Sequence, residues 1–84
     1  MKTFFLLELS QEQFINNQLD RGEIIKVTGD SLEAAYSLEL TSLGFKMLSF
    51  KQLKNNWILA THSGKTKFST PVIVYLLPLK NNIP

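Results

Sequence analysis

Apolar residues gather in short runs that have the length and composition of β-strands, and two other segments have the signals of a helix. Thr3–Leu9 is aromatic and aliphatic with a single charge, Glu8, and Glu23–Thr28 is rich in β-branched residues. Both segments have the length of ordinary strands. The first half of the chain therefore predicts two strands, with about a dozen residues between them.

Two segments have the signals of a helix. Ser10 precedes Gln13 by three residues, which is the spacing of a capping box, and it predicts a short helix over about residues 11–20. A longer helix is predicted between Ser31, a good N-cap residue, and Gly44, which can take the left-handed conformation that ends a helix. The predicted strand Glu23–Thr28, the turn that follows it and this second helix form the unit on which the other segments are expected to pack.

From residue 46 the period of the apolar and polar residues changes to two, which is the period of a β-strand. Lys46–Leu53 and Trp57–His62 are predicted to form a hairpin, and a short strand is expected over Thr66–Ser69. The last strand, Val72–Leu77, has a proline just before it and another just after it, and it is apolar on both faces. We expect this strand either to lie centrally in the sheet or to be covered by a helix on one face and a partner chain on the other.

These elements predict a small α+β fold. Its order is β-α-β-α-β-β-(β)-β, with two helices on one face of a mostly antiparallel sheet in a two-layer sandwich. Residues 1–80 are expected to form one domain, and residues 81–84 a frayed C-terminal tail.

Composition excludes several classes of protein. With 44% apolar and 19% charged residues, the chain is expected to be a soluble globular domain, and without cysteine it has no disulfide or zinc-thiolate site. The apolar run Phe4–Leu7 ends at Glu8 with no cleavage site for a signal peptide, and Val72–Leu77 is too short to span a membrane. We therefore expect a cytoplasmic protein. Its eight lysines to one arginine are compatible with an AT-rich phage or mobile-element genome.

Charge is distributed unevenly. Residues 1–39 carry a net charge of −4, whereas residues 40–84 carry six lysines and no acid. Such asymmetry can indicate an acidic or nucleic-acid partner. The alternative is internal, with acidic helices lying over a basic sheet.

Lysines alternate with aromatic residues in the second half of the chain, a pattern typical of sheets that bind single-stranded nucleic acid. In the alternative, Trp57 and Phe68 are core residues and the lysines only solubilise the outer face. The scarcity of arginine also weakens the case for nucleic acid. The candidate nucleic-acid contacts are Lys51, Lys54, Trp57, Lys65 and Lys67.

The sequence contains no recognisable catalytic or metal-binding pattern. Ser63–Thr66 resembles the end of a phosphate-binding P-loop, but Leu59 stands where that pattern requires glycine. His62 is the only histidine, and no cysteine or cluster of carboxylates accompanies it in sequence. We expect no enzymatic activity, no cofactor and no bound metal.

The helix that starts after Ser31 has two unusual features. Glu39 falls within its apolar arc, so its carboxylate must reach solvent or meet a cation, and a buried Glu39–His62 ion pair is one candidate. Ala34 and Leu38 fall outside the arc, which predicts a second contact surface.

The functional prediction is a non-enzymatic protein-interaction module, a regulator, adaptor or inhibitor of a larger protein, that also forms a homodimer. The predicted interface comprises Ala34, Leu38, Val72, Val74 and Leu76. The alternative is a nucleic-acid-binding protein that uses the lysine-rich sheet and its hairpin tips.

Overall fold

The segments predicted as strands, apart from Thr66–Ser69, form one sheet. The computed structural model describes residues 1–80, and its five strands lie in the order β2-β1-β5-β4-β3 with every neighbouring pair antiparallel. The predicted α+β class and element order are confirmed, and residues 81–84 lie outside the described residues. The strands are β1 (Lys2–Ser10), β2 (Glu23–Gly29), β3 (Met47–Gln52), β4 (Ile58–His62) and β5 (Val72–Leu79).

The first helix, α1, is shorter than predicted and covers only Gln11–Ile15. Its capping box is present: Ser10 Oγ accepts a bond from Gln13 N at 3.2 Å, and Gln13 Oε1 accepts one from Ser10 N at 2.9 Å. Asn17 has a positive φ of 55°, which ends the helical path, and a 3₁₀ turn, η1 (Leu19–Arg21), leads into β2. The two adjacent asparagines explain the early end, because they favour turns over helix interiors.

The longer helix, α2, covers Leu32–Ser42. Ser31 Oγ accepts a bond from Ala34 N at 3.2 Å, and Gly44 has a left-handed φ of 87°, as the sequence predicted for its two ends. No helix among the described residues is long and apolar enough to cross a membrane.

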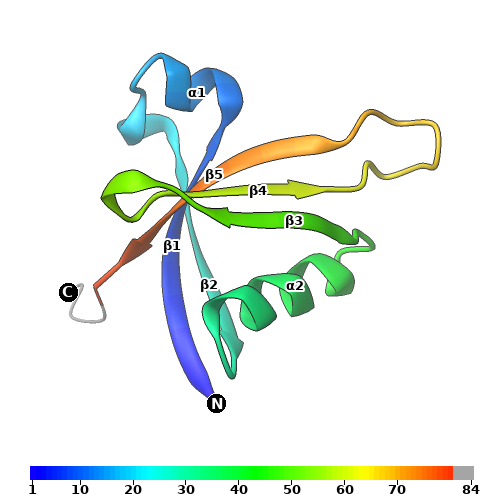
Figure 1. The fold of residues 1–84 in the computed structure, drawn as a ribbon, viewed down its shortest axis with the longest axis horizontal. Coiled ribbons are helices and arrows are strands. Elements are labelled where there is room, and N and C mark those ends of the chain that lie inside the picture. Colours follow the sequence, from blue (N-terminus) through cyan, green and yellow to red (C-terminus); the bar gives the residue numbers. More distant parts are fainter. Residues whose placement is uncertain (81–84) are drawn as a thin grey trace.

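α2 packs into the concave side of a strongly twisted sheet, in the angle between β2 and β3 (Figure 1). Gly29 allows this close approach, because a Cβ at that position would lie 2.8 Å from the backbone N and Cα of Ala35. The core lies between α2 and the sheet, and its buried residues are Leu6, Val27, Ala35, Tyr36, Leu40, Ile58, Ala60, Val74 and Leu76.

The predicted hairpin of β3 and β4 is present. Its connection is a 3₁₀ turn, η2 (Lys54–Asn56), in which Asn55 and Asn56 have positive φ values of 59° and 66°. The described chain has no strand over Thr66–Ser69. That segment forms a turn instead, in which Ser69 N donates to Thr66 O at 3.0 Å.

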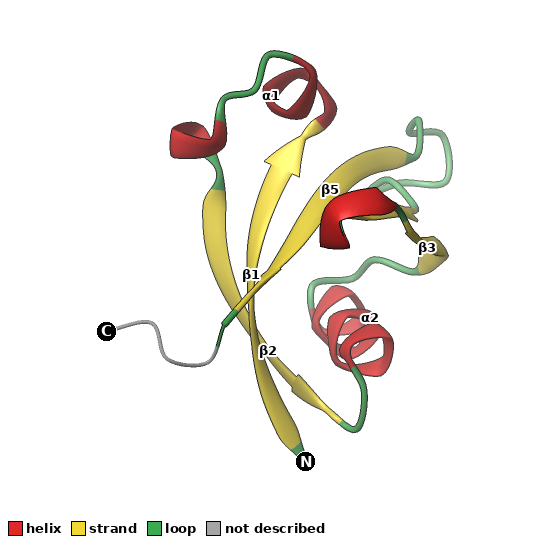
Figure 2. Ribbon diagram, turned by 60° about the vertical axis from the view of Figure 1, so that its left-hand side comes forward, coloured by secondary structure: helices red, strands yellow, loops and turns green. Residues whose placement is uncertain are grey.

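β5 is the third of the five strands, so it lies centrally. Val74 and Leu76 face α2, while the alternate residues Tyr75 and Leu77 face the opposite side of the sheet. α1 lies at the end of the sheet away from α2 (Figure 2), and Phe14 stacks on Tyr75. α1 therefore covers part of the face that α2 leaves free, so the two helices lie on opposite faces of the sheet and not together on one face as predicted.

Candidate functional site

The sheet has a face opposite α2, and part of that face is apolar. Directly opposite residues on paired strands share a face, so the register of β1 with β2 and β5 places two rows of side chains there. The rows are Lys26–Phe5–Leu79 and Ile24–Leu7–Leu77. We call the five apolar residues of these rows, Phe5, Leu7, Ile24, Leu77 and Leu79, the open patch.

The open patch is accessible from solvent. Ile24 is 63% exposed, and the other four side chains are half-buried. Of the six residues in the two rows, Lys26 alone carries a charge, and it lies at the margin next to Phe5. A contiguous apolar surface with a polar rim is the usual mark of an interaction site in a small domain.

The open patch ends where α1 and η1 cover the same face. We call residues 11–21 the lip. Leu9, two residues along β1 from Leu7, is completely buried beneath it, and a Cβ on Gly22 would collide with the Leu9 side chain and lie 2.8 Å from Leu7 Cδ1. The face opposite α2 is thus covered at Leu9 and uncovered from Leu7 towards the N-terminal end of β1.

An aromatic cluster fixes the lip in place. The rings of Phe14 and Tyr75 are parallel with centroids 3.8 Å apart, and Trp57 meets Phe14 edge-on at 4.9 Å. The cluster leaves Trp57 half-buried, in agreement with the alternative that this residue packs internally.

The predicted protein interface is only partly accessible. Leu38 is 55% exposed and Ala34 is exposed on α2, and Val72 is 38% exposed. Val74 and Leu76 were wrongly placed at the interface: their exposed fractions are 8% and 0%, because they face α2 in the core. A strand that is apolar on both faces gives no sign in its sequence of which face a helix will cover.

The open patch was not predicted from the sequence, although the sequence contains a signal for it. Phe5 and Leu7 alternate with the core residue Leu6, so β1 is apolar on both faces, as β5 is. Two neighbouring strands with this property predict a sheet covered on both sides. Within residues 1–80, the chain covers the face opposite α2 only as far as the lip.

The candidate nucleic-acid contacts fall into separate groups. Lys54 and Trp57 lie before β4, whereas Lys65 and Lys67 lie in the loop after it, and a strand of this length spans about 17 Å. Lys51 is opposite Leu59, on the face of the sheet away from α2. The five residues therefore do not form one cluster.

Phe68, at the tip of the loop between β4 and β5, is 88% exposed, so its predicted alternative role in the core is wrong. Thr66 Oγ1 accepts a bond from Phe68 N at 3.3 Å and lies 2.9 Å from Ser69 Oγ, which shapes the turn. Lys67 Nζ lies 5.1 Å from the centre of the Phe68 ring, within the range of a cation–π contact.

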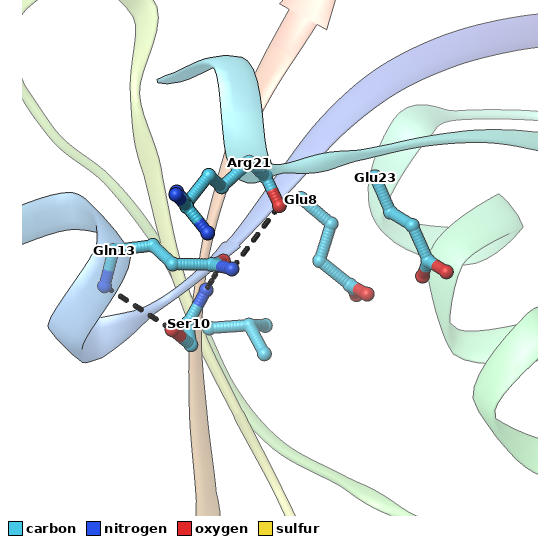
Figure 3. A pocket seen from close by; sticks show the side chains of 6 residues that line it. Glu8, Ser10, Gln13, Arg21 and Glu23 are labelled. Atoms are coloured by element: carbon cyan, nitrogen blue, oxygen red, sulfur yellow. Dashed lines mark hydrogen bonds between the residues drawn. The ribbon is translucent and has the colours of Figure 1, made fainter. Parts of the chain in front are cut away.

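A pocket of about 340 Å³ opens on the α2 side of the lip (Figure 3). Gln13 bridges it, with its Nε2 donating to the carbonyl oxygen of Arg21 at 3.1 Å. The like-charged Glu8 and Glu23 lie directly opposite each other on β1 and β2. The residues that line the pocket are Glu8, Ser10, Gln13, Arg21, Glu23 and Val74.

Glu8 is held by a residue of the core. Tyr36 Oη donates a hydrogen bond to Glu8 Oε2 at 2.9 Å. Burial raises the pKa of Tyr36 far above its usual value of about 10, and the charge and hydrogen bond of Glu8 and the charge of Glu39 add to the effect. This pairing links α2 to β1, so Glu8 has a structural role there.

His62 is buried at the end of β4. Its Nδ1 lies 3.1 Å from the carbonyl oxygen of Ser63, and the Phe45 ring packs against the imidazole at 4.6 Å. Glu39 is half-buried on α2, and its ion pair with His62 stays a prediction. Residues 1–80 contain no group of three or more metal-ligating side chains close enough to bind an ion.

Comparison with known protein families, with curated proteins and with solved structures found no match for this chain.

Proposed function

We propose that this protein is a non-enzymatic interaction module that binds a protein partner through the open patch. The observation that carries the proposal is the accessible apolar surface formed by the rows of β1, β2 and β5 beyond the lip. Burying apolar surface contributes about 25 cal/mol for each Å² removed from water, so a surface of this kind favours association. A small regulator, adaptor or inhibitor that works in the cytoplasm fits such a surface.

The open patch also lies on a rigid support. Its residues are on three neighbouring strands whose other face forms the core, so binding requires no rearrangement of the backbone. A preformed surface loses less conformational entropy on binding than a flexible one. The exposed α2 residues Ala34 and Leu38 lie outside the open patch and are not part of this proposed surface.

The change Ile24→Glu tests this proposal. A carboxylate within an apolar interface would be buried without a partner, so we expect at least a tenfold loss of affinity for the natural partner. The partner can be captured with the wild-type chain from a lysate of the source organism and then measured with each variant by isothermal titration.

Leu38→Glu is the matched control, because Leu38 is similarly exposed but lies on α2. We expect it to leave the affinity unchanged. If Leu38→Glu abolished binding and Ile24→Glu did not, the interface would lie on α2 and the proposal would be wrong.

A second candidate function, binding of single-stranded nucleic acid, is favoured by the loop between β4 and β5. Phe68 is exposed at its tip with Lys67 over one face of the ring, and Lys65 is also exposed. The other face of the ring is available for a base, and stacking of this kind contributes about 1–3 kcal/mol for each base.

For this candidate, we expect Phe68→Ala to weaken binding to a single-stranded oligonucleotide about tenfold, because the stacking surface is lost. Lys65→Ala should instead reduce the dependence of affinity on salt, since one phosphate contact disappears. Fluorescence anisotropy at several salt concentrations measures both effects. Equal affinities for the wild type and Phe68→Ala would remove this candidate.

A further inference from the structure

The shape of the partly covered sheet face suggests what binds there. In profile the face is a step: the lip stands above Leu9, and beyond it the open patch begins at Leu7. If a second copy is rotated by 180° about a two-fold axis, the raised lip of each copy faces the low open patch of the other. The stepped surface is therefore complementary to itself. Two-fold dimers use such self-complementary surfaces.

Charges on the two parts of the step are also complementary. The lip exposes Glu12 and Asp20; its one cation, Arg21, is also exposed but lines the pocket on the α2 side. Lys26 lies opposite Phe5, at the end of the open patch that is further from the lip. A half-turn therefore brings the acidic lip of one copy towards Lys26 of the other and keeps like charges apart.

Apolar residues of the lip fit the same arrangement. Ile15 is 70% exposed and Leu19 is 44% exposed. When the lip of one copy lies over the open patch of the other, these side chains can contact that patch. Association of this kind leaves fewer large apolar side chains in water.

We propose that the open patch binds a second copy of this chain, so that two sheets pack face to face about a two-fold axis with the α2 helices outside. The inference rests on the proposed function and names the partner. In the dimer the lip of each copy lies between the two sheets, over the open patch of the other copy. Across the axis, Asp20 of each copy lies near Lys26 of the other.

A charge exchange tests this arrangement. In Lys26→Glu every cross-copy pair becomes acid against acid, and in Asp20→Lys every pair becomes base against base. At low ionic strength we expect each variant alone to have a dimer dissociation constant about tenfold weaker than the wild type. An equimolar mixture of the two should recover near wild-type affinity, because both cross-copy pairs in the mixed dimer are then of opposite charge.

Sedimentation equilibrium of the intact chain measures these constants. Lys67→Glu is the control, since it makes the same charge change in the loop after β4 and should leave the dimer unaffected. Circular dichroism checks that each variant folds, and the substituted side chains are all exposed. Ile24→Glu adds a variant that does not depend on charge pairing and should be monomeric.

Three results would overturn the inference: a wild-type chain that stays monomeric at several hundred micromolar, a dimer that Ile24→Glu leaves intact, or a mixture that fails to recover affinity. A monomer whose capture of another protein is sensitive to Ile24→Glu would overturn the dimer and leave the proposed function standing. If Ile24→Glu changed neither the dimer nor the capture of another protein, the dimer and the proposed function would both be overturned.

Discussion

Leu76→Ala is expected to lower the free energy of unfolding by about 3–4 kcal/mol. Leu76 is completely buried in the centre of β5, beneath α2, where shortening the side chain leaves a cavity that the surrounding strands cannot fill. For a domain of this size, such a loss is a large part of the total stability. Urea denaturation followed by circular dichroism, at a concentration where the chain is monomeric, gives the value.

Ile24→Ala is the comparison for that experiment. Ile24 is 63% exposed on the other face of the sheet, so its truncation should cost less than about 1 kcal/mol. The difference between the two variants separates residues that hold the fold from residues that contact a partner. Equal losses would mean that the two faces of the sheet are equally buried, in disagreement with the structure.

Alkaline pH is expected to destabilise the protein through Tyr36. Because the pKa of Tyr36 is raised in the folded state, its contribution to stability is complete below the unfolded pKa of about 10 and is lost as the pH rises above it. The unfolded chain releases the phenolic proton while the folded chain keeps it. Stability should therefore fall by up to about 1.4 kcal/mol for each pH unit above 10.

Tyr36→Phe is the matched control for this pH dependence. The variant loses the hydrogen bond to Glu8, and we expect it to be about 1–2 kcal/mol less stable near neutral pH. It should also lack the part of the alkaline loss that Tyr36 causes. Urea denaturation of both proteins between pH 8 and pH 11 measures the two slopes. Parallel curves would show that Tyr36 does not control the alkaline limit.

Local signals in the sequence predicted most of the fold. Caps at Ser10 and Ser31, the stop at Gly44 and the two asparagines of the β3–β4 connection all act through nearby backbone groups, so their effects can be inferred without the tertiary structure. The loop at Phe68 was less predictable. Its alternating pattern resembles that of a strand, but in the structure side-chain bonds from Thr66 shape a turn.

The interface depended on information that the sequence lacks. β5 is apolar at successive positions, so its pattern cannot distinguish Leu76, which faces α2, from Leu77, which faces away. The choice is made by the register of β5 with β1 and by the side on which α2 packs. On β5, the predicted interface residue Leu76 and the open-patch residue Leu77 are therefore neighbours in sequence that lie on opposite faces of the sheet.

The working form of the protein is expected to cover the open patch. Methyl NMR with a soluble paramagnetic probe tests it most directly, because the probe broadens the signals of accessible methyl groups. As the chain concentration rises, or as a captured partner is added, the methyl groups of Ile24 and Leu77 should become protected while those of Leu38 stay accessible. Ile24 and Leu77 methyl groups that remain accessible under both conditions would contradict this expectation.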